Sequence, residues 1–298
     1  MRRWLAAVAL VAATVVSAAA TVWAQSTTGP PAVEIHKVDE GHFVPTPGGP
    51  YFMLVVGIDG RPGLGGNRGD ALHVIGVNPA QHAATIINIP RDSFVAIPGH
   101  GQDKINAAFD FGGPQLEADT VAALVGVHPT FVLVTGFVGF QAMVNDIGGV
   151  DVDVPMAMND HFSGANFPAG RVHMDGQHAL AFSRNRHLGQ GDLTRTQDQA
   201  ILLIDTLRQL RANGANSALG TVRVLGTLVR HTQVTGGVGV LDLYHLGRLA
   251  LSTDPGRVRN VTMPARLGQV GGASVVFVGA GAGDLFADFR DDAILETH

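Results

Sequence analysis

The fold is decided by one stretch, Tyr51-Phe52-Met53-Leu54-Val55-Val56-Gly57-Ile58, and by the loop that follows it, Asp59-Gly60-Arg61-Pro62-Gly63-Leu64-Gly65-Gly66-Asn67-Arg68-Gly69-Asp70. The continuous apolar, β-forming run Phe52–Ile58 predicts a strand buried on both faces. The glycine content of the loop is no dinucleotide-binding fingerprint, because the full spacing is missing and no helix opens directly behind it. The stretch therefore predicts a buried strand that ends in a polar loop bounded by two carboxylates.

Outward from this strand, strand and helix patterns alternate along the whole chain, which predicts an α/β domain with helices packed on a central sheet. Further strands are expected at Leu72–Val77, Thr85–Ile89, Phe131–Thr135, Val150–Val154, near 257–263 and near 274–278. Helices are expected at 114–126, 137–147, 192–211, near 219–231 and 239–251, and in a short segment at the end. On the helix that Asp192 would cap, Ile201, Leu203, Ile204, Leu207 and Leu210 form the expected buried stripe.

The composition excludes several classes of protein. The 298 residues are 46% hydrophobic and 15% charged, which excludes a disordered chain, and the net charge of −5 argues against a broad nucleic-acid surface. Without cysteine there are no disulfides, thiolate metal sites or cysteine nucleophiles. The sequence also lacks a Gly-x-Ser-x-Gly elbow, a Walker-type Gly-Lys-Ser/Thr and a His-Glu-x-x-His motif, and most of the 13 histidines are expected at the surface or as caps.

The N-terminus predicts export. Arg2 and Arg3 precede an uncharged run from Trp4 to Ala24, about the length that spans a bilayer. We expect a membrane anchor over 1–24, although Val22-Trp23-Ala24 would also serve as a cleavage site. Residues 25–50 are rich in proline and glycine and predict a linker, so the folded domain is expected over 51–298, outside the cytoplasmic membrane.

The loop after the first strand predicts a cation and phosphate site. Asp59 and Asp70 flank it, and two carboxylates can hold Mg²⁺ together with water and phosphate oxygens. Arg61 and Arg68 lie in the same loop and could meet that phosphate. An ordinary surface loop with solvated charges is the alternative.

Two further clusters carry side chains suited to phosphate. Arg91 and Asp92 end a predicted strand, where α/β folds bind ligands, and Lys104 follows in a loop. The second cluster holds Arg184 and Arg186, predicted to alternate on an extended segment, and Arg195 and Gln199, which share a helix face. Solvated surface charge and local ion pairs are the alternatives for each. The guanidinium groups suit planar, bidentate contact with phosphate.

Taken in order, these blocks resemble the LytR-CpsA-Psr family of cell-envelope phosphotransferases. The resemblance covers roughly Tyr51 to Leu210, and more loosely the remainder. The matching residues are Val56-Gly57-Ile58-Asp59-Gly60-Arg61, Arg68-Gly69-Asp70, Ile89-Pro90-Arg91-Asp92, Lys104-Ile105-Asn106-Ala107-Ala108-Phe109, Gly112-Gly113, Gly148-Gly149-Val150-Asp151-Val152-Asp153-Val154-Pro155, Gly176-Gln177-His178-Ala179-Leu180, Arg184-x-Arg186 and Asp192-x-x-Arg195.

The resemblance implies a three-layer α/β/α domain with a central mixed sheet and an apolar tunnel for a polyprenyl chain. It implies transfer of a glycan phosphate from a polyprenyl-pyrophosphate-linked donor onto peptidoglycan. By carry-over, magnesium is held by Asp59 and Asp70, and the phosphates are bound by Arg61, Arg68, Arg91, Lys104, Arg184, Arg186, Arg195 and Gln199. Asp92 is the expected base for the acceptor hydroxyl.

This sequence departs from the family pattern in places. Asp198 precedes Gln199 where the family usually has arginine, and an acid three residues from Arg195 could pair with it and weaken the positive field on the substrate. Gly60 and Gly69 stand where hydroxyl residues are usual. Two other functions therefore stay open. One is a pyrophosphatase that cleaves the same lipid with water, and the other is a non-catalytic, membrane-anchored carrier of lipid or glycan.

Overall fold

The computed structural model of the chain describes residues 33–38, 49–58, 68–185, 192–215, 217, 220–222, 224, 226, 232–235 and 237–296. The predicted membrane anchor, the linker residues 25–32, 39–48 and the loop residues 59–67 lie outside this part, as does most of the helix expected near 219–231. Among the described helices none is both long and apolar enough to cross a membrane.

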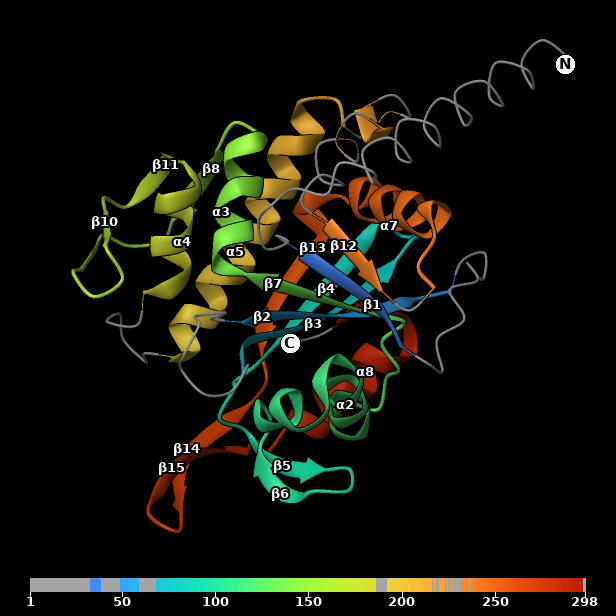
Figure 1. Ribbon diagram of the computed structural model, residues 1–298, viewed down its shortest axis with the longest axis vertical. Helices are drawn as coiled ribbons and strands as arrows, with labels where there is room; N and C mark the ends of the chain where they lie inside the picture. Colours follow the sequence, from blue (N-terminus) through green and yellow to red (C-terminus); the bar gives the residue numbers. More distant parts are fainter. Residues whose placement is uncertain are drawn as a thin grey trace, which may run out of the picture.

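A seven-stranded sheet forms the centre of the molecule, with helices above and below it (Figure 1). In spatial order its strands are β12 (Thr232–Thr235), β1 (Val33–Lys37), β7 (Phe131–Gly136), β2 (Tyr51–Ile58), β3 (Gly69–Asn78), β4 (Ala83–Ile89) and β13 (Val258–Thr262). The pairs β1–β12, β2–β7 and β4–β13 are parallel and the other three are antiparallel. The predicted α/β class with a central mixed sheet is thus confirmed.

Four small two-stranded antiparallel sheets accompany the central sheet. They are β5 (Phe94–Ile97) with β6 (Gly101–Lys104), β8 (Val150–Val154) with β11 (Gly170–Met174), β9 (Met158–Asp160) with β10 (Ala165–Phe167), and β14 (Ala265–Val270) with β15 (Ala273–Val278). On one face of the sheet lie α2 (Ala107–Val125) and α8 (Ala282–Asp292). On the other lie α3 (Phe137–Asp146), α4 (Gly176–Arg184), α5 (Asp192–Ala212) and α7 (Val240–Ser252), and a 3₁₀ turn spans Pro255–Arg257.

The two faces of the sheet are filled differently. Side chains alternate along a strand, so Leu54 and Val56 of β2 point to the face of α2 and α8, where they are fully buried. Met53 and Val55 point to the opposite face and are only partly buried, because they line a cavity. The prediction that β2 is buried on both faces by protein is therefore wrong for the second face, where the apolar surface borders open space.

Three predicted elements need correction. The segment 25–50 contains β1, in which apolar Val33 and Ile35 alternate with polar Glu34 and His36, so the chain joins the sheet before residue 51. The helix expected from Pro114 begins earlier, at Ala107, and bends at Gly112 and Gly113, so that Pro114 starts its second segment.

The buried face of α5 is also different from the predicted stripe. Ala200 and Leu202 are buried, whereas Leu203 is 37% exposed and borders the cavity. The reason is that the helix packs against β8, where Asp205 and Gln209 accept hydrogen bonds from the backbone amides of Asp153 and Asp151. Part of the face of α5 that contacts β8 is therefore polar, and it does not coincide with the predicted stripe of leucine and isoleucine.

The close packing of α8 on the sheet makes a prediction for Gly76 on β3. A Cβ atom at this position would lie 2.6 Å from the ring of Phe289 and 2.7 Å from the Cβ of Ala293. We expect Gly76→Ala to lower the free energy of unfolding by about 1–3 kcal/mol, since the core must shift to admit it. The measurement is urea denaturation. Gly283→Ala in α8, where nothing lies within 4 Å, is the matched control and should leave stability unchanged or raise it. Equal effects of the two variants would contradict this packing.

Candidate functional site

The ends of four strands meet at one edge of the sheet. Strands β2, β7, β4 and β13 run in the same direction, and the last residues of β2 and β7, Ile58 and Gly136, are paired in register. The antiparallel strand β3 starts at this edge, which places Asp70 there, and the chain leaving β4 places Arg91 beside it. Carboxyl ends of parallel strands are where α/β sheets bind ligands.

A row of alternating charges extends outward from this edge. Arg91 donates a hydrogen bond from Nη1 to the carboxylate of Asp70, and its Nε lies 4.0 Å from Oδ2 of Asp92. The Nζ of Lys104 lies 2.9 Å from Oδ1 of Asp92. All four side chains are about one quarter exposed, so the row Asp70–Arg91–Asp92–Lys104 is open to solvent and to anions.

Two further arginines reach the same place from helices. Arg195 of α5 is only 4% exposed and donates a hydrogen bond of 2.7 Å from Nη2 to the backbone oxygen of Asp70. Arg184 is the last residue of α4, and its guanidinium lies 5.0 Å from the ring centre of Phe137. The extended segment predicted for Arg184 is thus wrong, because the helix begins at the Asp175 cap and continues to Arg184.

A buried polar chain crosses the sheet behind these arginines. His73 is 3% exposed, and its Nδ1 lies 2.8 Å from Oδ1 of Asn88, whose Nδ2 donates to Oδ1 of Asn260. Since the Asn88 amide nitrogen serves Asn260, its oxygen accepts the proton of His73 Nδ1. Burial lowers the pKa of His73, which keeps the ring neutral and leaves Nε2 as an acceptor.

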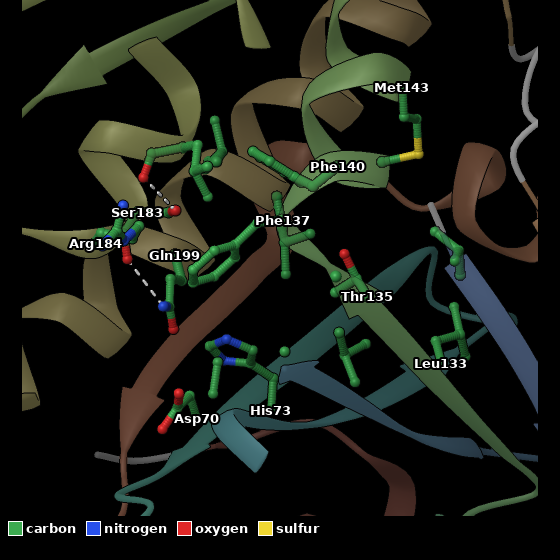
Figure 2. Close-up of a pocket in the computed structure, with 18 of the residues that line it drawn as sticks. Asp70, His73, Leu133, Thr135, Phe137, Phe140, Met143, Ser183, Arg184 and Gln199 are labelled. Carbon is green, nitrogen blue, oxygen red and sulfur yellow. Dashed lines mark hydrogen bonds between the residues drawn. The ribbon is translucent and has the colours of Figure 1, made fainter. Parts of the chain in front are cut away.

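Gln199 completes the inner part of the site. Its Nε2 donates a 2.9 Å hydrogen bond to the backbone oxygen of Ser183, and its amide lies beside the His73 ring (Figure 2). The buried Oε1 of Gln199 receives no hydrogen bond within the described part of the chain. A neutral His73 with its proton on Nδ1 cannot donate to it, so this oxygen is suited to a donor on a ligand.

These groups close one end of a large cavity. The cavity has a volume of about 590 Å³ and lies between the sheet and the helices α3, α4, α5 and α7. Its polar lining includes Asp70, His73, Ser183, Arg184, Arg195 and Gln199. Much of the remaining wall is apolar, including Val33, Ile35, Met53, Val55, Leu133, Phe140, Met143, Leu202, Leu243 and Leu246. In Figure 2, Asp70, His73 and Gln199 lie at one side and Leu133 at the other.

The structure thus brings many of the predicted residues together. Four line the cavity: Asp70, Arg184, Arg195 and Gln199. Arg91, Asp92 and Lys104 adjoin it through the row of charges that begins at Asp70, and Arg68 is exposed two residues before Asp70. The remaining three, Asp59, Arg61 and Arg186, lie outside the described residues.

Sequence reasoning missed His73, which was grouped with histidines expected at the surface. A signal was present, because a single histidine interrupts the otherwise apolar run Ala71–Val77 of β3. A polar side chain in a buried strand needs a partner, and Asn88, directly opposite in the β3–β4 register, supplies it.

The metal prediction rests on Asp70 alone within the described part. No group of three or more histidine, aspartate or glutamate side chains there could hold a metal ion by itself. Asp70 fits a hard cation in chemistry, since its carboxylate stands at the polar end of the cavity. A cation bound there would share or displace the contact of this carboxylate with Arg91.

Comparison with known proteins gives one family. The sequence matches the LytR_cpsA_psr family over residues 15–284. It is 32% identical over 253 residues to the probable cell wall biosynthesis protein LcpB of Corynebacterium glutamicum, covering 80% of this chain and 60% of that protein. It is 34% identical over 177 residues to the polyisoprenyl-teichoic acid–peptidoglycan teichoic acid transferase TagU of Bacillus mycoides, covering 58% of this chain and 57% of that protein. The chain therefore spans about 60% of the length of these relatives.

Solved structures share the fold. The LytR-CPS2A-psr family protein YwtF (TagT), solved with bound octaprenyl pyrophosphate lipid, superposes with a TM-score of 0.65. The superposition covers 87% of this chain and 97% of that one, at 20% sequence identity.

The contacts of Asp198 differ from the ion pair with Arg195 that the sequence suggested. It makes no ion pair with Arg195 or any other described residue, and it is 1% exposed with Oδ2 unpaired among them. Burial raises its pKa to about 7. The carboxyl is therefore largely neutral below pH 7, and it weakens the field of Arg195 less than a fully ionised acid would.

This burial predicts a pH dependence of stability. An aspartate titrates near pH 4 in the unfolded chain and near 7 in the fold, so the folded state holds the extra proton between these values. The contribution of Asp198 is then fully present below pH 4, falls as the pH rises, and is lost above 7. We expect Asp198→Asn to be more stable than the parent by about 2–4 kcal/mol at pH 8, and equally stable near pH 4. Urea melts at both pH values measure this, and a variant that is no more stable at pH 8 would contradict it.

Proposed function

The chain belongs to the LytR-CpsA-Psr family, and from this premise we propose that it transfers a glycan phosphate from a polyprenyl-pyrophosphate-linked donor onto peptidoglycan. The observation that carries the proposal is a 590 Å³ cavity that is apolar along most of its wall and ends in guanidinium groups. The name of TagU supports the reaction, and the octaprenyl pyrophosphate bound to TagT supports the donor class.

The cavity matches the two ends of such a donor. An apolar lipid chain gains free energy by leaving water for the wall formed by Ile35, Leu133 and Leu246. A diphosphate needs donors and positive charge where the lipid ends, and Arg184 and Arg195 provide both at the cavity wall. Cations in a water-poor pocket bind phosphate more strongly than exposed ones.

Phosphoryl transfer depends on positioning and charge stabilisation more than on covalent help from the protein. The acceptor oxygen would attack the phosphorus that carries the glycan, the bond from that phosphorus to the polyprenyl phosphate would break, and the hydroxyl proton would be released. Arg195 and Arg184 would hold the inner phosphate, and Arg91 the outer one. Arg68, with Arg61 and Arg186 beyond the described residues, would add charge at the opening.

Magnesium belongs to the same proposal. Asp70, with Asp59 from the adjoining loop, would hold the ion, which supplies positive charge to the phosphate oxygens. The protein's own contribution is to orient Asp70 through the Arg91 and Arg195 contacts at its carboxylate and its backbone oxygen.

The contacts of Asp92 argue against its predicted role as a base. Its Oδ1 is ion-paired with the Nζ of Lys104, and its Oδ2 lies 4.0 Å from the Nε of Arg91, so both carboxylate oxygens face cations of the site rather than a free acceptor hydroxyl. Asp92 is better suited to hold Lys104 and Arg91 in place toward the phosphates.

We further propose that the domain works outside the cytoplasmic membrane, with residues 4–24 as its anchor. Arg2 and Arg3, followed by that apolar run, support this proposal.

The reaction is tested with the purified full chain, a polyprenyl-pyrophosphate glycan donor, Mg²⁺, and peptidoglycan either present or absent. We expect glycan phosphate on peptidoglycan, and about a 10²–10³-fold loss of rate in Arg195→Ala, because transition-state charge loses its buried donor. Asp70→Ala should lose the magnesium dependence as well. Arg171→Ala, which removes an exposed guanidinium on β11, is the control. Equal release of polyprenyl phosphate without peptidoglycan would instead show a pyrophosphatase, and donor binding without turnover a carrier.

The lipid part of the proposal is tested by filling the cavity. Leu133→Trp places a bulky side chain on the β7 wall, so we expect weaker binding of a long polyprenyl donor and little change for a short one. Competition binding with donors of two chain lengths measures this. Val138→Trp on α3, where the parent side chain is 62% exposed, is the matched control. Loss of affinity for both donors alike would oppose a lipid in this cavity.

A further inference from the structure

His73 lies where the polar end of the cavity meets its apolar wall. In the sheet register His73 is opposite Val55, and Val55 is opposite Leu133, so the histidine is level with two apolar residues that line the cavity. Asp70 lies nearer the edge of the sheet, at the start of the same strand. On its other side His73 is opposite Asn88, so the two strands beside it place no charge opposite the ring. A lipid phosphate whose chain follows this wall would therefore end beside His73.

Two hydrogen-bond acceptors meet at this place. The proton on Nδ1 of His73 is used by Asn88, so the lone pair of Nε2 lies on the other side of the ring, where the amide of Gln199 lies (Figure 2). Gln199 donates from Nε2 to the backbone oxygen of Ser183, and its buried Oε1 receives no hydrogen bond from the described residues. Neighbouring acceptors of this kind are satisfied when a ligand brings a proton between them.

His73 is the ionisable side chain of the described cavity wall that keeps a neutral acceptor. The ionisable residues of this wall are Asp70, His73, Asp160, Arg184 and Arg195. The carboxylate of Asp70 meets Arg91, and that of Asp160 accepts two hydrogen bonds within its own turn. The guanidinium groups have no lone pair to offer. Burial lowers the pKa of His73, so its ring is neutral and Nε2 keeps its lone pair.

We propose that His73 and Gln199 bind the phosphate of the lipid product in its protonated form, so that the site keeps the proton given up by the acceptor hydroxyl. This inference rests on the proposed transferase function. In the reaction the acceptor O–H bond breaks, and its oxygen forms a bond to the glycan-bearing phosphorus. The bond from that phosphorus to the bridging oxygen breaks, and the electron pair stays on the polyprenyl phosphate. The proton ends on an oxygen of this phosphate, so each product carries one of the two negative charges of the diphosphate.

The donors and acceptors of the site fit this product. Arg184 and Arg195 donate to its charged oxygens, while the P–O–H group points at Nε2 of His73 with Oε1 of Gln199 beside it. A phosphate without this proton would set its lone pairs against both acceptors. The diphosphate of the donor carries no proton at neutral pH, so the two acceptors favour the cleaved state over the donor.

The first experiment measures the proton taken up when the product binds. Geranylgeranyl phosphate, a lipid monophosphate, is titrated into the purified full chain in detergent at pH 7.5, by calorimetry in two buffers of different ionisation enthalpy. The second pKa of a phosphate monoester is about 6, so the free ligand is mostly a dianion. We expect binding to take up about one proton per ligand, and the affinity to fall as the pH rises from 6 to 8.

Two variants assign this proton to the proposed acceptors. His73→Leu should abolish the uptake and weaken the binding of geranylgeranyl phosphate about tenfold, since the acceptor for the proton is lost. Gln199→Met, which removes the second acceptor and leaves His73 in place, should act in the same direction, and it tests the proposal if His73→Leu does not fold. His128→Leu, which removes an exposed histidine, is the matched control and should bind like the parent.

A second ligand reports whether each variant still has an intact site. The methyl ester of geranylgeranyl diphosphate has no phosphate that titrates near neutral pH, so its binding should take up no proton, and His73→Leu should change its affinity little. Proton release when the monophosphate binds would overturn the proposal, because the arginines would then hold the dianion. Uptake that persists in both variants would also overturn it, as would an equal loss of affinity for the two ligands.

Failure of this inference can be told apart from failure of the proposed function. If the monophosphate binds with a proton uptake that depends on His73, but no transfer occurs with any donor, the product site stands and the transferase is wrong. If transfer occurs and depends on Arg195, but binding takes up no proton, the transferase stands and the proton leaves by another route.

Discussion

The whole structure depends on an unequal filling of the two faces of one sheet. On one face Leu54, Val56 and their neighbours are sealed by α2 and α8. On the other face equally apolar side chains such as Met53 and Val55 border a cavity. The side chains of a cavity wall make fewer dispersion contacts than those of a close-packed core. The close-packed face, covered by α2 and α8, therefore contributes more to the stability of the fold than the face that borders the cavity.

Asp70 joins the parts that surround the open face. Its carboxylate meets Arg91 from the end of β4, and its backbone oxygen accepts a hydrogen bond from Arg195 of α5. The sheet edge and the helix that closes the cavity are therefore fixed to a single residue. The same position carries the metal proposal, so any ligand that binds Asp70 would act on both arginines at once.

The electrostatics of the molecule are local. The chain has a net charge of −5, yet Arg184 and Arg195 converge at the polar end of the cavity and Arg91 and Lys104 continue outward. Asp198 lies in the same helix as Arg195, but its burial favours the neutral form over an ion pair. Site charge thus depends on burial and contact, which a count of acids and bases along the chain does not reveal. It also explains why an acid beside Gln199 is compatible with an anion site.

The sequence by itself determined the class of the fold and five of the seven strands of the central sheet, because period-two alternation and apolar runs depend on neighbours along the chain. It also selected Asp70, Arg91, Arg195 and Gln199, since strand ends and shared helix faces follow from local geometry. It missed β1, whose five residues are flanked by proline-rich segments and are stabilised only by pairing with distant β7 and β12. His73 was missed for the same reason, because its partner Asn88 is opposite only after β3 and β4 pair.

Only the tertiary structure decided which apolar surface is core and which is cavity wall. Leu54 and Leu133 look alike in sequence, yet one is sealed by α8 and the other borders open space, because packing is set by which helix covers which face. It also decided that Asp92 pairs with Lys104. Such pairings join residues far apart in the chain, and hydrophobic pattern and spacing carry no information about them.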